Sequence, residues 1–154
     1  MLPEIDFPAP EFTLRDQHGA TVALSEVVGK RPVVLVFFPL AFTGTCTEEL
    51  GELRDNIAMF AEAGAALLAI SVDSMATLRE FADREHYPFA LLSDFWPHGE
   101  VSRRYGVLLE DKGFATRGTF VIDRDGVLRA RFVAGPGEAR DVAAYRDALG
   151  VLRR

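Results

Sequence analysis

An unbroken apolar run, VVLVFF at residues 33–38, restricts the fold more than any other feature of the sequence. A second run, AALLAISV, follows at residues 65–72. Strands that are apolar on both faces are typical of the buried centre of a parallel sheet covered by helices. The two runs therefore predict two central strands, and parallel neighbours need a long crossover between them.

The predicted crossover is a helix that begins at about Cys46 and ends at Gly64. Apolar residues recur there at helical spacing, and the glycine ends the pattern. They are Leu50, Leu53, Ile57 and Phe60. Strand, helix and strand then form a βαβ unit with a right-handed crossover.

Further patterns predict elements on both sides of this unit. A hairpin spans residues 12–24 around a turn at residues 16–19. After the unit we expect a helix from Ser74 to about Glu85, a short strand within 88–94, a short helix at 100–105, strands at 119–122 and 127–133, and a last helix from Asp141. This order predicts an α/β fold of the thioredoxin-like sandwich type, with a central mixed β-sheet flanked by helices. The N-terminal β-hairpin is an extension of it, and residues 1–154 form one domain.

The composition restricts the partners and the compartment. The 154 residues carry 17 basic and 23 acidic side chains, for a formal net charge of −6. Without a basic stripe, neither nucleic acid nor an anionic membrane surface is expected as a partner. The sequence shows no signal peptide and no segment long and apolar enough to cross a membrane. Cys46 is the only cysteine, which fits a reducing compartment, so we expect a cytoplasmic protein.

Cys46 is predicted to lie where the first central strand connects to its helix. Open α/β sheets place their sites at this carboxyl edge. A thiol in the first helical turn meets free backbone N–H groups and the positive end of the helix dipole, which favour the reactive thiolate form. The alternative is a buried structural cysteine, but such a residue would need neither a helix start nor a polar approach loop.

The residues around Cys46 carry a resemblance to a known family. Pro39, Thr43 and Cys46 form P-x-x-x-T-x-x-C, Glu49 follows three residues later, and Arg117 stands in TRGTFVID. With the segments FTLRDQHG and LLSDFWPHG, nearly the whole chain resembles the one-cysteine peroxiredoxins of the AhpE type, in the alkyl hydroperoxide reductase and thiol-specific antioxidant family. The resemblance implies a thiol peroxidase that reduces hydrogen peroxide, organic hydroperoxides and peroxynitrite.

This chemistry explains the types of residue in the motif. Thiolate sulfur attacks one peroxide oxygen, so charge on sulfur and on both oxygens must be stabilised. Arg117 offers a fixed positive charge and several donors, and the Thr43 hydroxyl can donate and accept. Pro39 can shield the thiolate from water, and Glu49 can orient Arg117 through a charge-assisted hydrogen bond.

Cys46 would become a sulfenic acid, and no second cysteine is present to resolve it. An external thiol must therefore form a mixed disulfide and be displaced. The resemblance implies mycothiol with a mycoredoxin, or a thioredoxin, as the reductant. It implies no metal, haem or flavin cofactor, and the three histidines are too widely spread for a metal cluster.

Three aromatic residues, Phe42, Phe95 and Trp96, have several interpretations. They could pack in the core, form an apolar collar that favours organic hydroperoxides, or make a dimer contact. Together with the resemblance, they lead us to expect a non-covalent homodimer.

Two rival functions remain. A thiol–disulfide oxidoreductase on the same fold would want C-x-x-C, but position 49 is Glu. A thioredoxin-like binding or chaperone module with an inert cysteine is the alternative that is not an enzyme.

Overall fold

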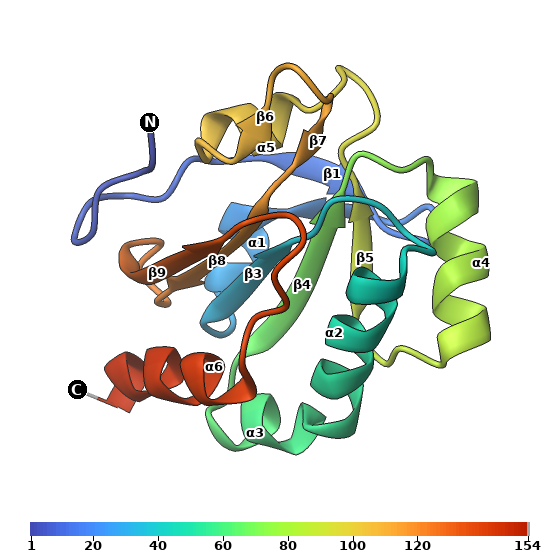
Figure 1. Cartoon of the computed structure of the whole chain (residues 1–154). Coiled ribbons are helices and arrows are strands. Elements are labelled where there is room, and N and C mark those ends of the chain that lie inside the picture. Colours follow the sequence, from blue (N-terminus) through green and yellow to red (C-terminus); the bar gives the residue numbers. More distant parts are fainter. Residues whose placement is uncertain (154) are drawn as a thin grey trace.

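A seven-stranded sheet forms the centre of the computed structural model, which describes residues 1–153 (Figure 1). The strands follow the spatial order β2-β1-β5-β4-β3-β8-β9. Their bounds are β1 Thr13–Arg15, β2 Thr21–Ala23, β3 Val33–Phe37, β4 Ala66–Ser71, β5 Ala90–Ser93, β8 Arg117–Ile122 and β9 Leu128–Ala134. Strands β3, β4 and β5 run parallel, whereas β8 is antiparallel to β3, and β1 is antiparallel to β5. The sheet is therefore mixed, as predicted.

Strand β3 lies at the middle of the sheet, and all five of its residues are buried. Val34 and Val36 face one hydrophobic core, whereas Val33, Leu35 and Phe37 face the other. This alternation explains the unbroken apolar run, because both faces of the strand are covered. The prediction of two central strands from the apolar runs is confirmed by the pairing of β3 with β4.

Helices cover both faces of the sheet (Figure 1). Side chains from α2, α3, α4 and α6 enter the first core, and those from α1 and α5 enter the second. The bounds are α1 Leu24–Val28, α2 Gly44–Asp55, α3 Ile57–Glu62, α4 Met75–Glu85, α5 Glu100–Arg104 and α6 Val142–Leu149, followed by a 3-10 turn at Gly150–Arg153. The thioredoxin-like α/β fold class is thus confirmed.

The crossover helix differs from its prediction at both ends. It begins at Gly44, two residues before Cys46, and it ends at Asp55. Asn56 then has non-helical backbone angles (φ −116°, ψ 24°), and its side chain donates to the Glu52 carbonyl. An asparagine that binds the preceding backbone in this way competes with helix propagation, so the segment continues as the separate helix α3.

The starts of two helices were predicted correctly, and each is capped by the residue named. Ser74 accepts a hydrogen bond from the Thr77 N–H at the start of α4, and Asp141 accepts one from the Ala143 N–H at the start of α6. Helix α1 and the small hairpin of β6 (Leu108–Leu109) and β7 (Phe114–Ala115) were not predicted. These elements are two to five residues long, too short for a periodic pattern.

The N-terminal hairpin joins the central sheet, because β1 pairs with β5 through Arg15 and Ser93. Strand β8 begins at Arg117, two residues earlier than predicted. Within residues 1–153, no helix is long and apolar enough to cross a membrane.

Candidate active site

Cys46 lies in the first turn of α2, beyond the carboxyl end of β3. The connection between them ends at Thr43, whose backbone is extended (φ −80°, ψ 148°) at the cap position of the helix. The cysteine side chain is fully buried, with 0% of its surface exposed. Its sulfur therefore combines a helix N-terminus with complete exclusion from bulk water.

Arg117 reaches Cys46 because of the antiparallel pairing of β8 with β3. Val36, near the end of β3, pairs with Thr119, so the start of β8 lies beside the carboxyl end of β3. The Arg117 side chain is 1% exposed, and its Nη2 donates to the Cys46 Sγ at 3.1 Å. The structure thus brings together two residues that are 71 positions apart in the sequence.

The Arg117 guanidinium is fixed by two further hydrogen bonds. Its Nη1 donates to Glu49 Oε1 at 2.9 Å, and its Nε donates to the Pro136 carbonyl at 2.9 Å. Glu49 lies almost one turn after Cys46 on α2, so the helix sets the spacing between sulfur and carboxylate. Three of the five N–H groups of Arg117 take part in these contacts, which leaves one on Nη1 and one on Nη2.

Sequence reasoning missed a second arginine, Arg140, which contacts the same carboxylate. Its Nε donates to Glu49 Oε2 at 3.0 Å, its Nη2 donates to Oε1 at 2.6 Å, and its backbone N–H also donates to Oε2. A third side-chain nitrogen, Nη1, donates to the Gly118 carbonyl and to Thr119 Oγ1. The only sequence signal was a positive charge just before the Asp141 cap, which by itself indicates nothing.

Glu49 is held in its charged form by these two arginines. Burial raises the pKa of a carboxyl group, but the hydrogen bonds and charge of Arg140, together with the charge of Arg117, outweigh this effect and hold the pKa of Glu49 below its usual range. One carboxylate between two guanidinium groups leaves a net charge of +1 beside the Cys46 sulfur. An ionised sulfur would bring the formal charge of the four groups to zero.

The connection before α2 contains Pro39, which is buried, and Thr43, which is exposed. The Thr43 hydroxyl donates to the Leu40 carbonyl at 2.9 Å. Phe42, between them, has a left-handed backbone (φ 66°), a conformation that costs energy for a residue other than glycine.

Asp73 helps to hold this strained connection, although the sequence did not reveal it. Its Oδ2 accepts hydrogen bonds from the Ala41 N–H at 2.8 Å and from the Ser71 hydroxyl at 2.7 Å. Because Ala41 precedes Phe42, the carboxylate ties the strained residue to the end of β4.

The three aromatic residues are exposed, so core packing does not describe them. Phe42 is 47% exposed and packs on Phe81 at a ring-centroid distance of 5.0 Å. Phe95 and Trp96 are 52% and 80% exposed, and with Met75 they line a groove of about 450 Å³. The lining of this groove does not include Cys46, Arg117, Thr43 or Pro39.

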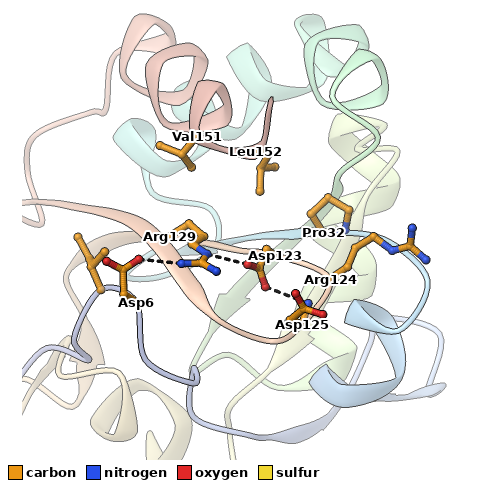
Figure 2. Close-up of a pocket in the computed structure, with 9 residues that line it drawn as sticks. Asp6, Pro32, Asp123, Arg124, Asp125, Arg129, Val151 and Leu152 are labelled. Carbon is orange, nitrogen blue, oxygen red and sulfur yellow. Dashed lines mark hydrogen bonds and ion pairs between the residues drawn. The ribbon is translucent and has the colours of Figure 1, made fainter. Parts of the chain in front are cut away.

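A larger cavity of about 720 Å³ lies away from the cysteine. Figure 2 shows Asp6, Arg129 and Asp123 along its floor, joined by ion pairs, with Val151 and Leu152 opposite. Pro32, which also lines it, precedes β3, whereas Cys46 follows that strand. This cavity is therefore at the opposite end of the sheet. In the described part of the chain, no group of His, Cys, Asp and Glu side chains could hold a metal ion.

Known proteins share the sequence and the fold of this chain. The model of the AhpC/TSA family matches residues 5–131. The chain is 51% identical over 144 residues to alkyl hydroperoxide reductase E of Mycobacterium tuberculosis, covering 94% of each chain. It is 41% identical over 122 residues to peroxiredoxin Q of Oryza sativa subsp. japonica, covering 79% of this chain and 55% of that protein.

Solved structures show the same fold. The crystal structure of peroxidoxin BcpB from Mycobacterium tuberculosis superposes with a TM-score of 0.80 at 34% identity, covering 97% of both chains. The reduced 2-Cys peroxiredoxin of Plasmodium vivax superposes with a TM-score of 0.88 at 26% identity, covering 98% of this chain and 83% of that one.

The chain therefore belongs to the AhpC/TSA family. It is a thiol-dependent peroxidase, and its single cysteine fits a one-cysteine mechanism.

Proposed function

We propose that Cys46 is the peroxidatic residue and that Arg117, Thr43 and Pro39 complete its catalytic site. The observation that carries this proposal is the 3.1 Å hydrogen bond from Arg117 to the Cys46 sulfur, between two buried side chains. An inert structural cysteine would need no such partner. A charged donor buried against sulfur favours the thiolate, which is the nucleophile.

In the proposed reaction the Cys46 thiolate attacks the hydroxyl oxygen of the peroxide. A sulfur–oxygen bond forms, the oxygen–oxygen bond breaks, and the rest of the peroxide leaves as hydroxide, as alkoxide or, from peroxynitrite, as nitrite. Hydroxide or alkoxide takes a proton from solvent to give water or an alcohol, and Cys46 becomes a sulfenic acid. The sulfur supplies the two electrons.

Arg117 supports the reaction by stabilising charge on sulfur and on the peroxide oxygens. Its hydrogen bonds to Glu49 and to the Pro136 carbonyl fix the plane of the guanidinium before the substrate arrives. Glu49, held in turn by Arg140, acts as a positioning residue. In this proposal the Thr43 hydroxyl, which donates to the Leu40 carbonyl, accepts a hydrogen bond from the peroxide, and the buried Pro39 excludes water.

The sulfenic acid is resolved by an external thiol. One thiol attacks the Cys46 sulfur, forms a mixed disulfide and releases water, and a second thiol displaces it to restore Cys46. As reductant we propose mycothiol with a mycoredoxin, or a thioredoxin. As substrates we propose hydrogen peroxide, organic hydroperoxides and peroxynitrite. The similarity to a mycobacterial alkyl hydroperoxide reductase supports the organic hydroperoxides.

A test of this site compares the wild type with Cys46→Ser and with Thr43→Val. After one equivalent of hydrogen peroxide, the wild type should lose its thiol within milliseconds to seconds and label with a sulfenic-acid probe, while remaining monomeric on non-reducing gels. Cys46→Ser should fold but show no turnover with either peroxide class, and Thr43→Val should be slower. A wild-type thiol that reacts only as fast as free cysteine would favour the inert binding module. A disulfide-linked dimer as the main product would contradict the proposal that an external thiol resolves the sulfenic acid.

We also propose that the chain is one domain, works in the cytoplasm and forms a non-covalent homodimer. The exposed Phe95 and Trp96, beside a groove, support an apolar contact between two copies. Light scattering at micromolar protein tests the dimer, and Trp96→Ser should shift the mass toward the monomer. A wild-type mass of one chain at all concentrations would refute it.

A further inference from the structure

The buried Cys46 sulfur creates a problem for the second half of the proposed reaction. With 0% of the side chain exposed, an attacking thiol cannot come within bonding distance until covering atoms move. Cys46 is itself part of the first turn of α2, so the contacts that hold this turn in place control whether the sulfur can move out toward a thiol.

Thr47, the residue after Cys46, is where these contacts meet. Its N–H and its hydroxyl both donate to the Thr43 carbonyl, at 2.9 Å and 2.8 Å. Its own carbonyl accepts a hydrogen bond from the Tyr87 hydroxyl at 3.1 Å. Tyr87 is 40 residues away, in the connection between α4 and β5, so it fastens the turn from outside the helix.

The Tyr87 ring is itself held in place. It stacks on Phe89 at 5.3 Å, meets Phe81 edge-on at 5.1 Å, and lies 5.8 Å below the Arg54 guanidinium. Only 6% of the residue is exposed. Because the ring is already fixed by packing, it loses little further conformational entropy when its hydroxyl donates to Thr47, and the hydrogen bond is well oriented.

We propose that Tyr87 is a positioning residue whose hydrogen bond to the Thr47 carbonyl keeps the first turn of α2 closed over Cys46 and thereby limits attack by the resolving thiol. This inference rests on the proposed function for its biological meaning. The opening itself exists whether or not the chain reduces peroxides. Hydrogen peroxide must also displace some atoms around the buried sulfur, but with two heavy atoms it needs a smaller displacement than a thiol does, and it reacts in the form in which Arg117 contacts the sulfur.

The Tyr87 hydroxyl stays protonated, and therefore remains a hydrogen-bond donor, at pH values near neutrality. Burial raises the pKa of Tyr87 well above its ordinary value, and the nearby charge of Glu85 adds to the effect. The hydrogen bond is therefore insensitive to pH near neutrality, and its effect can be measured by deleting the oxygen alone.

Tyr87→Phe removes the donor and keeps the ring. A single hydrogen bond makes a modest net contribution to the stability of the closed form, so its loss should raise the population of the open form about 2- to 12-fold. Alkylation of the reduced Cys46 by iodoacetamide, followed by mass spectrometry, should accelerate by this factor. Reaction of the sulfenic acid with 2-mercaptoethanol should accelerate equally. Oxidation by hydrogen peroxide should stay within twofold of the wild type, because the closed form still predominates.

Tyr105→Phe is the matched control. Tyr105 is also buried, and its hydroxyl also donates to a backbone carbonyl, that of Pro10, in the N-terminal segment. Its loss should leave all three rates within twofold of the wild type. Faster hydrogen exchange in peptides that cover residues 44–50, in Tyr87→Phe and not in Tyr105→Phe, would support the proposal further.

The proposal is overturned if Tyr87→Phe leaves alkylation and the thiol step unchanged. It is also overturned if Tyr105→Phe accelerates both equally, since general loosening would then be the cause. The alkylation arm needs no peroxide, so it tests the role of Tyr87 even if the proposed peroxidatic role of Cys46 fails. That failure would appear separately, as a wild-type thiol that peroxide does not oxidise rapidly.

Discussion

Glu49→Gln should destabilise the protein more than any other isosteric change in the site. The two carboxylate oxygens accept four hydrogen bonds, one from Arg117 and three from Arg140. A glutamine offers one oxygen, and its amide nitrogen would face donors, so at least two of the four donors lose their acceptor. All three side chains are 1% exposed, so water cannot replace the lost charge.

The expected cost is about 3–5 kcal/mol, the range for removing one partner of a buried ion pair. With a urea dependence of about 2 kcal/mol per molar, the unfolding midpoint should fall by about 1.5–2.5 M. Urea titration followed by circular dichroism measures this shift. Glu48→Gln is the control, because Glu48 is an exposed carboxylate in the same helical turn and should change the free energy of unfolding by less than about 0.5 kcal/mol.

The pH dependence gives a second check on the same reasoning. The folded-state pKa of Glu49 lies below the unfolded value of 4.5, so the ionised carboxylate stabilises the fold above that pH. The stabilisation is lost as the pH falls through the folded-state pKa. The difference in unfolding free energy between the wild type and Glu49→Gln should therefore narrow in acid. A midpoint shift below about 0.5 M at neutral pH, or a difference that widens in acid, would refute the ion-pair account.

Three other predictions follow from neighbouring contacts. Arg117→Ala should slow oxidation by hydrogen peroxide roughly 100- to 1,000-fold, even at high pH where the thiolate is fully formed, and Arg117→Lys should restore only part of the lost rate. Stopped-flow measurements across pH test this. If the rate of Arg117→Ala reached the wild-type value at high pH, the arginine would serve only to ionise the thiol. Asp73→Ala leaves the Ala41 N–H without its acceptor, so it should lower the unfolding free energy by about 1–3 kcal/mol and slow peroxide oxidation. An unchanged oxidation rate would mean that the connection between β3 and α2 keeps its shape without Asp73. Tyr145→Phe should leave stability unchanged or slightly higher by urea titration, because within residues 1–153 its buried hydroxyl has no hydrogen-bond partner; a loss above about 1 kcal/mol would reveal one.

Much of the fold could be predicted because its strongest signals are local. The apolar runs at β3 and β4 indicate that both faces of these strands are buried, without indicating which elements cover them. The caps at Ser74 and Asp141 depend on backbone groups two or three residues away. The helix break at Asn56 is also local, but the apolar spacing continues across it, and the periodic pattern therefore concealed it.

The contacts that hold the site together are long-range, and no local pattern contains them. Arg140 lies 91 residues from Glu49, and Asp73 lies 32 residues from Ala41. Arg117 was found only because its surrounding segment resembles that of a known family. An arginine beside a helix cap has the same appearance in the sequence whether its side chain is solvated or, like that of Arg140, buried against a carboxylate. The burial of that carboxylate creates the need for a second positive charge, and burial follows from the tertiary structure.

The charges of the site also connect its two half-reactions. With the sulfur ionised, Cys46, Glu49 and the two arginines form a buried set whose formal charge is zero, a condition under which burying charges is least costly. Oxidation to a neutral sulfenic acid removes one negative charge and leaves the set at +1. An uncompensated buried charge favours conformations that admit water, and the sulfur itself belongs to the first turn of α2. The oxidised chain thus has an electrostatic reason to open that the reduced chain lacks, and the Tyr87–Thr47 hydrogen bond opposes this opening.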